Sequence, residues 1–434
     1  MKLVELSEKE YTSFAEKHKQ ANFHQTINWG NLKTKNGWKP NYVGFKQGNK
    51  ITAGALILEK NLLGKKMFYS PRGFLIDYED KKLLKEFTQE IKNYLKKKKA
   101  IFCKIDPYVI HKERDIDGNI IEDGINNEIA IKNLKDLGYK HFGYTLKMGE
   151  TLQPRWMFTL TFNGKNTEEI MSEMDPKTRQ LLRKNERCAM KCREIEYDEI
   201  STFKEIMQHT GDRRDFIDRP LSYYQDMWKA MHDDGIFKIL FVELHVKEYI
   251  EILKQEIEQL EKEKKERIYK KEKNILKMNE KKFESRNKQD DEAIKRETKK
   301  KEEMERLQEK YGDIITLGGI SFLIYGNEVL SLNGGTYAEF MHFNSAYNLH
   351  WEMVKYAIEN GYKKYNFYGI DGIFDEKDPM YGLYLFKRGF GGQVEELIGE
   401  FDLVVDKLYY FIYKTAFKTY KTLKNIKNNI RKKK

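Results

Sequence analysis

Charged and aromatic residues at the expected ends of helices and strands are the positions in this sequence that could carry chemistry. The signatures of several large enzyme classes are absent: there is no G-x-x-x-x-G-K-[ST] phosphate loop, no H-E-x-x-H, no G-x-S-x-G, and no G-x-G-x-x-G after a strand. Nucleotide hydrolysis, zinc hydrolysis and serine-type acyl transfer are therefore disfavoured. The three cysteines are too few and too unevenly spaced for a cysteine-built metal site, and we expect no metal.

Two candidate residues lie in the first third of the chain. Lys35 falls on the last turn of a helix expected to stop at Asn36 and Gly37, where its charge either complements the helix dipole or binds a ligand. Asp106 follows an apolar strand expected at residues 100–105, the end of a strand at which open α/β sheets gather ligands. The alternative for Asp106 is a turn aspartate before a proline.

Two further candidates flank an expected helix start. Arg219 and Tyr223 are four residues apart, with Pro220 in the first turn, so they share one face of the helix. An arginine beside a helix N-terminus suits a phosphate, because both offer donors to an anion. A surface ion pair is the alternative for Arg219.

A last pair of cations precedes a glycine-rich turn. Residues 384–392 place Lys387 and Arg388 directly before Gly389, Gly391 and Gly392. The turn is similar to the phosphate-binding loop of acetyl-CoA-dependent acetyltransferases but departs from that pattern at position 393, which is a glutamine. Coenzyme A is therefore not predicted from it.

The elements that must position these residues form two alternating α/β regions. We expect residues 1–153 to form the first, and residues 154–245 with 311–403 to form the second. Both contain an amphipathic helix, a basic turn, an apolar strand and a terminal aspartate, at residues 87–106 and 349–371. A duplication would explain this shared theme, as would chance, because helix-then-strand units are common in α/β proteins.

A charged insertion interrupts the second region. Residues 246–310 contain no proline or glycine, and apolar residues at alternating spacings of four and three begin at Val246 and resume at Met304, as in a coiled-coil seam. A single helix of this length would measure about 97 Å and carry the chain away from the domain it must rejoin. Two antiparallel helices with a turn within residues 274–287 are therefore expected, and a disordered charged linker is the alternative.

The composition fits a folded chain of more than one domain. Its 434 residues exceed what one hydrophobic core usually organises, and 40% are hydrophobic and 13% aromatic. No stretch approaches the roughly eighteen apolar residues of a membrane span, and the charged residues 1–20 do not resemble a signal peptide. We therefore expect a cytoplasmic protein.

Most of the net charge of +12 lies at the C-terminal end. Residues 406–434 contain ten Lys or Arg against one Asp, which gives +9 and leaves the rest of the chain close to neutral. Apolar residues recur among these lysines over residues 404–434, a basic amphipathic pattern that suits an anionic membrane face or RNA. The alternative is a final helix that packs its apolar side on the body.

Several short motifs, in order along nearly the whole chain, resemble the Fem family of bacterial peptidoglycan-bridge aminoacyltransferases, of the FemA, FemB and FemX type. They lie at residues 23–26 (FHQT), 69–78 (YSPRGFLIDY), 105–108 (IDPY), 334–336 (GGT) and 365–369 (YNFYG). The second is similar to the family's YS-x-RGP-x-IDY, with Phe74 in place of the proline. The charged insertion at residues 246–310 lies between the same motifs as the helical arm of the family's FemA-like branch, so the chain resembles that branch.

The resemblance implies an α/β (α+β) fold of two acetyltransferase-like (GNAT) domains with an inserted antiparallel two-helix coiled-coil arm. It implies transfer of an amino acid, of the glycine, serine or alanine class, from aminoacyl-tRNA to the stem-peptide amine of a peptidoglycan precursor. That precursor is a lipid-linked or UDP-linked muramyl-pentapeptide. No cofactor is expected besides the aminoacyl-tRNA donor. Peripheral contact with the inner membrane face and a dimer with itself or with Fem-like paralogues are further partners that the resemblance implies.

The resemblance also implies roles for the precursor-binding candidates. Lys35, Arg219 and Tyr223 are similar to the family's ligands for the phosphates of the precursor and the groups beside them. A further family tyrosine, expected at residues 330–332, is absent here.

For the reacting groups, Asp106 resembles the acidic residue near the acceptor amine, and Phe386 and Lys387 resemble the pair that faces the aminoacyl end of the tRNA. A lysine amine is almost wholly protonated at pH 7, so exposing its lone pair costs about 4 to 5 kcal/mol unless a nearby group accepts the proton. Asp106 or a group of the substrate could accept it. The ester of aminoacyl-tRNA is already activated, so positioning should supply most of the acceleration, and Lys387 is expected to stabilise negative charge at the leaving ribose oxygen or the carbonyl.

Two other functions fit the same fold. An acetyl-CoA-dependent N-acetyltransferase predicts coenzyme A binding, and a non-catalytic immunity or binding protein would hold tRNA or precursor without transfer. The joint presence of the precursor-binding candidates and Lys387 argues against the binding protein, because a pure binder has no need for a pair at the aminoacyl end.

Overall fold

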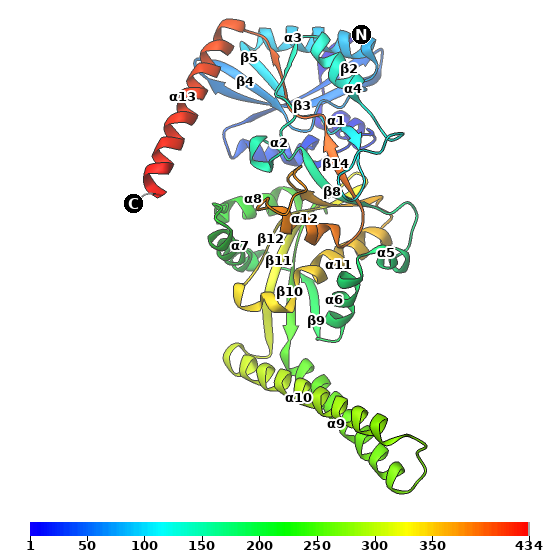
Figure 1. The fold of residues 1–434 in the computed structure, drawn as a ribbon. Coiled ribbons are helices and arrows are strands. Elements are labelled where there is room, and N and C mark those ends of the chain that lie inside the picture. The colour runs from blue at the N-terminus through cyan, green and yellow to red at the C-terminus, as the bar shows by residue number, and fades with distance from the viewer. Residues whose placement is uncertain (433–434) are drawn as a thin grey trace.

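The computed structural model describes residues 1–432, with side chains described up to Thr419, and arranges them as two β-sheets with helices on their faces (Figure 1). The first sheet consists, in spatial order, of β1 (Lys2–Glu5), β2 (Lys39–Gln47), β3 (Lys50–Leu62), β4 (Lys65–Ser70), β5 (Ala100–Ile105), β15 (Phe401–Val404) and β7 (Tyr139–His141). β4 and β5 are parallel, and the other neighbours are antiparallel.

The second sheet is built mainly from the chain after residue 155, with β6 added from the earlier part. It consists, in spatial order, of β9 (Met190–Glu194), β10 (Phe237–His245), β11 (Ile314–Tyr325), β12 (Glu328–Thr336), β13 (Lys364–Gly369), β8 (Trp156–Thr161), β14 (Gln393–Leu397) and β6 (Ile110–Glu113). Only the pair β12 and β13 is parallel among these strands.

The two sheets share one topological unit. In each, four antiparallel strands in chain order lead through a crossing helix to a fifth strand parallel to the fourth. The crossing helices are α3 (Lys81–Lys97) in the first sheet and α11 (Ala346–Glu359) in the second. The crossing helices and the strands after them overlap residues 87–106 and 349–371, where the sequence shows the same order of helix, strand and aspartate. The shared topology therefore supports a duplicated unit.

The domain boundaries expected at residues 153 and 403 do not separate the two sheets. β6 lies before residue 153 but pairs with β14 in the second sheet, and β15 returns to pair with β5 and β7 in the first. The chain crosses after β5, at Pro107, returns to the first sheet between β6 and β7, and passes to the second sheet again between β7 and β8. It crosses a last time at Gly399, whose φ of +89° turns it between β14 and β15. Local patterning could not reveal this exchange, because it indicates a strand without indicating its partner.

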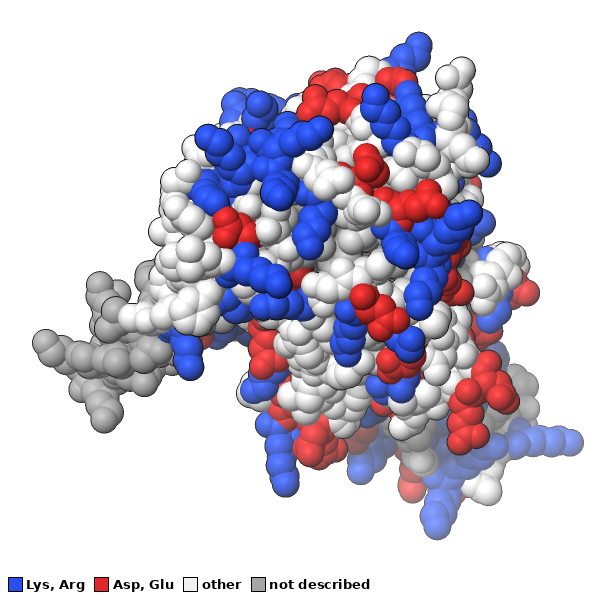
Figure 2. All heavy atoms as spheres, turned by 90° about the horizontal axis from the view of Figure 1, so that it is seen from above, with Lys and Arg blue, Asp and Glu red and all other residues white. Residues whose placement is uncertain are grey.

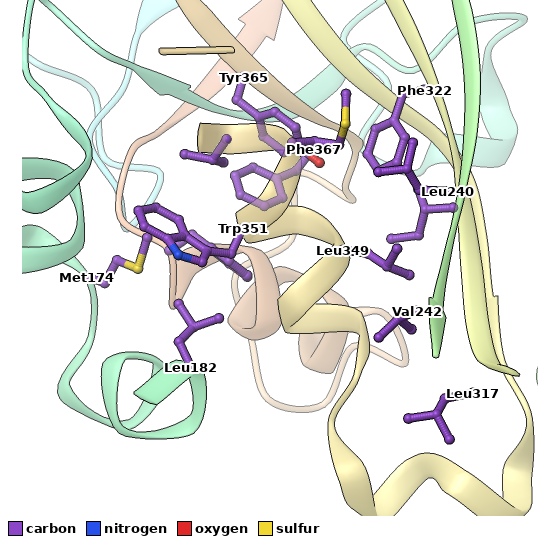
Figure 3. Packing of buried hydrophobic residues seen from close by; sticks show 14 of the residues in the cluster. Met174, Leu182, Leu240, Val242, Leu317, Phe322, Leu349, Trp351, Tyr365 and Phe367 are labelled. Atoms are coloured by element: carbon purple, nitrogen blue, oxygen red, sulfur yellow. The ribbon is translucent and has the colours of Figure 1, made fainter. Parts of the chain in front are cut away.

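Three main clusters of buried apolar side chains hold these layers together. One lies between the first sheet and the helices α3 and α4 (Glu128–Asp136). A second lies between the second sheet and α11, α5 (Thr167–Glu173) and α6 (Pro176–Glu186), where Trp351 packs near Met174 and Leu182 (Figure 3).

The third cluster joins the two domains. It lies among α1 (Glu8–Ala15) and α2 (Ile27–Thr34) of the first domain and α7 (Ile200–Arg214) and α8 (Leu221–Met231) of the second. Tyr11 and Trp29 are buried in the same cluster as Phe203, Trp228 and Phe237. The domains therefore share a core.

The insertion is a pair of antiparallel helices, α9 (Val246–Glu272) and α10 (Glu280–Tyr311), which project from the second sheet away from the first (Figure 1). At the base, Val246, Leu253 and Met304 are buried in the second domain. Farther out, charged side chains pair across the two helices, as Lys264 does with Asp291 at 2.5 Å. The two-helix arm is confirmed, and the disordered linker is wrong.

The last described element is α13 (Lys407–Lys432), which starts beside β5 and leaves the body of the first domain (Figure 1). Residues 433–434 of the expected tail lie outside the described residues. The remaining short elements are η1 (Phe23–Gln25), η2 (Met148–Glu150), η3 (Tyr197–Glu199), η4 (Ala338–Phe343) and α12 (Tyr381–Arg388). Among the residues that the structure describes, no helix has the length and apolar character needed to cross a membrane.

The outer part of the arm is expected to be dispensable for folding. Replacing residues 257–300 by a short Asn-Gly turn keeps the buried base and removes mainly solvated ion pairs, which contribute little to stability. We expect the melting temperature to change by less than about 3 °C, measured by calorimetry. Loss of cooperative unfolding in this variant would mean that the outer arm is part of the fold.

Candidate active site

Asp106 is buried at the carboxyl end of β5, only 2% exposed. Its Oδ1 accepts a hydrogen bond from the backbone N–H of Arg72 at 2.7 Å, and its Oδ2 accepts one from the hydroxyl of Tyr69 at 2.9 Å. Burial raises the pKa of Asp106 to about 6, although the charge of Arg72 acts in the opposite direction. The carboxylate is therefore poised to accept a proton near neutral pH.

Arg72 was not singled out as a site residue from the sequence, although it lies in the motif at residues 69–78. It is buried and has a φ of +54°, and its Nη2 donates to the carbonyl of Pro154 at 2.8 Å. Its charge acts on the buried side chain of His24 and on the half-buried side chain of Tyr368. Its place before Gly73, in a motif that resembles one of the Fem family, could have identified Arg72 from the sequence.

Tyr368 brings the end of β13 to the same place. Its hydroxyl donates to Oε1 of Gln153 at 3.0 Å, and its φ is +65°. Burial raises its pKa to about 12, and the charges of Arg72 and Asp106 also act on it, in opposite directions. The ends of β5 and β13, one from each sheet, thus meet at one site between the domains.

Lys387 also contacts this strand end. It lies on α12, is 6% exposed, and its Nζ donates to the carbonyl of Gly369 at 2.7 Å. It makes no ion pair with a carboxylate of the described residues, and burial lowers its pKa to about 7. At neutral pH this amine is close to equally divided between its charged and neutral forms.

Phe386 supports the helix that carries Lys387. Its ring meets the ring of Tyr347 edge-on at 4.7 Å and that of His350 at 5.3 Å between centroids. His350 is buried, and burial together with the charge of Lys387 lowers its pKa to about 3. His350 is therefore neutral, and these rings form an apolar wall beside the lysine.

The precursor-binding candidates are only partly brought together. Arg219 and Tyr223 lie side by side, with the guanidinium carbon 5.4 Å from the ring centre, and Arg219 forms no ion pair within the described residues. Lys33, on α2, is near Arg219: burial and then the charge of Arg219 lower the pKa of Lys33 to about 8. Lys35 caps the end of α2 with an exposed side chain that has no partner among the described residues.

Helical spacing could have identified Lys33. It is four residues after the buried Trp29, and its Nζ lies 4.0 Å from the centre of that ring. Residues four apart share a helix face, so Lys33 faces the domain interface together with Trp29. Lys35 is half a turn away and points to solvent.

The glycine-rich turn after α12 has a packing role. A Cβ on Gly392, whose φ is +105°, would lie 2.2 Å from the carbonyl of Thr159 on β8. The turn also follows the end of a helix, so it offers no free N-terminal amides to a phosphate. Its similarity to a coenzyme A loop therefore has a structural cause unrelated to a ligand.

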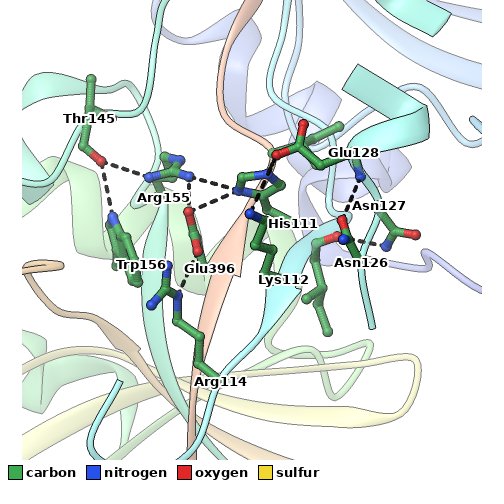
Figure 4. A network of polar contacts seen from close by, with 12 residues as sticks. His111, Lys112, Arg114, Asn126, Asn127, Glu128, Thr145, Arg155, Trp156 and Glu396 are labelled. Atoms are coloured by element: carbon green, nitrogen blue, oxygen red, sulfur yellow. Dashed lines mark hydrogen bonds and ion pairs between the residues drawn. The ribbon is translucent and has the colours of Figure 1, made fainter. Parts of the chain in front are cut away.

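A second buried polar cluster fastens β6 to the second sheet (Figure 4). Glu396 accepts hydrogen bonds from Arg155, from Arg114 at 2.6 Å and from His111 at 2.9 Å. Burial raises the pKa of Glu396, but His111 and the two arginines outweigh this and lower it to about 2. The carboxylate of Glu396 is thus paired with two arginines, so the cluster is a structural ion network.

Within the part of the chain that the structure describes, no group of three or more His, Cys, Asp or Glu side chains could hold a metal ion. The site instead offers one carboxylate, one lysine of lowered pKa and a nearby pair of cations. Such a set suits proton transfer at a reacting centre beside an anionic group.

Comparison with known proteins gives the family. A model described as the FemAB family matches residues 6–418. The chain belongs to the FemAB family. It is 31% identical to aminoacyltransferase FemA of Staphylococcus aureus (strain bovine RF122 / ET3-1) over 425 residues, which cover 97% of this chain and 99% of that protein. A crystal structure of FemX is similar with a TM-score of 0.79 and 27% identity, over 95% of this chain and 99% of that one.

Membership in the FemAB family confirms the family expected from the motifs. The expected fold class, two acetyltransferase-like domains with an inserted two-helix arm, is confirmed as well. The roles of individual site residues in this FemAB protein stay predictions.

Burial of Lys387 should cost stability, as is common at catalytic positions. A fall in pKa from 10.5 to about 7 corresponds to roughly 4 to 5 kcal/mol, part of which the hydrogen bond to Gly369 offsets. We expect Lys387→Met, of similar length and uncharged, to raise the free energy of unfolding at pH 7 by about 2 to 4 kcal/mol.

The pH dependence provides the check. The unfolded lysine is charged below pH 10.5 and the folded one below about pH 7. The gain in the free energy of unfolding should therefore be full below about pH 7 and should shrink as the pH rises from 7 towards 10.5. Urea unfolding of both proteins across this range measures it. A gain that does not change with pH would show that the methionine acts through packing instead.

Proposed function

We propose that this enzyme transfers an amino acid, of the glycine, serine or alanine class, from aminoacyl-tRNA to the stem-peptide amine of a peptidoglycan precursor, and so builds the interpeptide bridge. The observation that carries the proposal is that each of the two strand ends at the site holds one buried titratable group, Asp106 after β5 and Lys387 on the carbonyl of Gly369 at the end of β13. Their pKa values of about 6 and about 7 suit proton transfer at neutral pH. Its relatives bear the name aminoacyltransferase.

In the proposed reaction the acceptor amine attacks the carbonyl carbon of the aminoacyl ester. Asp106 accepts the proton that the amine loses, and the bond to the ribose oxygen breaks. Lys387 donates to the oxygen that gains negative charge, and Phe386 forms the wall beside it. The ester is already activated, so positioning the two substrates supplies most of the acceleration.

The precursor's phosphates are proposed to bind at the mouth of the site. Arg219 offers a guanidinium with no ion-pair partner among the described residues, next to the start of α8, and Tyr223 lies beside it. Lys33 adds a second cation from α2. Lys35, the lysine that the family resemblance suggested, lies one half-turn further along the same helix.

The remaining parts of the proposal concern partners and location. The donor is aminoacyl-tRNA and no cofactor takes part. The acceptor is a muramyl-pentapeptide carried on a lipid or on UDP, and the enzyme works in the cytoplasm with peripheral contact at the inner membrane face. A dimer with itself or with Fem-like paralogues completes the hypothesis.

The direct test is a transfer assay in vitro. Glycyl-, seryl- and alanyl-tRNA are each mixed with the enzyme and purified lipid-linked or UDP-linked precursor, and the product mass is measured. We expect the precursor to gain the mass of one or more residues of one of these amino acids. No gain with any pairing would refute the proposed function.

The pH profile tests the roles of the two buried groups, Asp106 and Lys387. We expect kcat/KM to rise as Asp106 ionises around pH 6 and to fall as Lys387 loses its proton above about pH 7. Asp106→Asn should lower kcat by about 10²- to 10⁴-fold and remove the acid limb. Lys387→Met should lower kcat and remove the alkaline limb. An Asp106→Asn enzyme that keeps both limbs would show that another group accepts the proton.

A matched pair of variants decides which lysine of α2 holds the precursor. Lys33→Met removes the cation near Arg219 and should raise the KM for precursor by about ten- to a hundredfold, with little change in kcat. Lys35→Met removes an exposed charge two residues away and should change KM less than about twofold. The opposite ranking would support the assignment made from the family resemblance.

A further inference from the structure

Three elements meet at one corner of the first domain, where α13 begins. The backbone N–H of Asp406 donates to the carbonyl of Ile101, which places the start of α13 beside the start of β5. The backbone N–H of Lys66 donates to the carbonyl of Lys99, which places the β3–β4 hairpin beside the end of α3. The ammonium of Lys65 lies 4.0 Å from the ring centre of Tyr409 and joins the hairpin to α13.

One side of α13 packs on the sheet. Tyr410 meets the ring of Phe102 edge-on at 5.5 Å, and Tyr413 stacks on the same ring at 5.0 Å. This side belongs to a small cluster with Leu62 and Met67. Tyr410 and Tyr413 of α13 are therefore packed against the first domain.

The other side of α13 is apolar and has nothing on it among the described residues. Leu408 is 65% exposed, Phe411 is 69% exposed and Ile412 is 44% exposed. They are spaced three and four apart and so form one stripe. Leu63, at the tip of the β3–β4 hairpin, is another exposed apolar side chain at this corner.

Positive charge surrounds the stripe. Figure 2 shows Lys and Arg side chains gathered on the first domain, on the side where α13 leaves the body. Lys96, Lys97, Lys99 and Lys407 are exposed there and form no ion pair within the described residues. The acidic residues of the corner, Glu59 and Asp406, are already paired with Lys66 and Lys65.

We propose that this corner surface, formed by Leu63, Leu408, Phe411 and Ile412 with Lys96, Lys97, Lys99 and Lys407, docks the enzyme on an anionic lipid bilayer. Apolar side chains that enter the acyl boundary, ringed by lysines at headgroup level, are the features of a helix that lies in a membrane interface. RNA would use the lysines but would leave the aliphatic stripe in water, so the bilayer fits both parts of the surface.

The inference deepens the proposed function by naming the surface that would hold the enzyme at a lipid-linked acceptor, and it rests on that function. The lysines attract the anionic headgroups and the stripe adds apolar contact. The ends of α3, α13 and the hairpin lie on the first domain, so the arm of the second domain is left free to project into solution (Figure 1).

The test uses the full chain and vesicles of phosphatidylglycerol mixed with phosphatidylcholine. We expect the wild-type protein to co-sediment with these vesicles, to do so less at high salt, and to stay in solution with phosphatidylcholine alone. Leu408→Ser/Phe411→Ser/Ile412→Ser, at exposed positions, should keep the melting temperature but bind the anionic vesicles at least about tenfold more weakly. Lys96→Gln/Lys97→Gln should also weaken binding.

Tyr269→Ser/Ile275→Ser at the outer end of the arm is the matched control, because these side chains are equally exposed and distant from the corner. It should bind vesicles like the wild type. With a UDP-linked, water-soluble acceptor the triple variant should transfer at the same rate as the wild type. Failure of the wild type with both the UDP-linked and the lipid-linked acceptor would refute the function and leave the vesicle result standing.

Three results would overturn the proposal. The first is equal vesicle binding by the triple variant and the wild type. The second is a wild-type oligomer that the triple variant dissociates while neither protein binds vesicles, which would make the stripe a contact with a second copy. The third is weaker tRNA binding by the triple variant with unchanged vesicle binding, which would assign the surface to RNA.

Discussion

The apolar core between the two sheets is the constraint on which the rest of the structure depends. Tyr11 and Trp29 from the first domain are buried with Phe203, Trp228 and Phe237 from the second. Because these side chains cover one another, neither domain has a complete surface by itself. Their packing fixes how the sheets face each other, and thereby sets where the end of β5 meets the end of β13.

Burial at that meeting point explains the chemistry of the site. Asp106 and Lys387 are both buried and have no ion-pair partner in the part of the chain that the structure describes. Burial therefore raises the pKa of Asp106 to about 6 and lowers that of Lys387 to about 7. Glu396 is the opposite case, because its hydrogen bond to His111 and its two arginine partners outweigh burial and lower its pKa to about 2. A fully paired carboxylate stabilises the fold, whereas an unpaired one is able to exchange protons at neutral pH.

Local sequence patterns predicted the parts of the molecule that are locally determined. The spacing of apolar residues from Val246 and from Met304 predicted the arm, and the apolar strand before Asp106 predicted its place at a sheet end. The exchange of β6 and β15 between the sheets was not predictable, because strand pairing depends on residues far apart in the sequence. Lys33 was not predicted, because it differs from Lys35 only in lying on the same helix face as Trp29. That Trp29 faces the domain interface follows from the tertiary structure.

The short segment before β8 holds the two halves of the site together. Arg72 and Tyr368 each adopt a left-handed backbone, at a cost on the order of 1 kcal/mol or more per residue. Each is compensated by a bond to consecutive residues of that segment: Arg72 donates to the carbonyl of Pro154, and Tyr368 donates to Gln153. The segment joins the first domain to the second in sequence, so the link between the domains also fixes the distance between Asp106 and the end of β13.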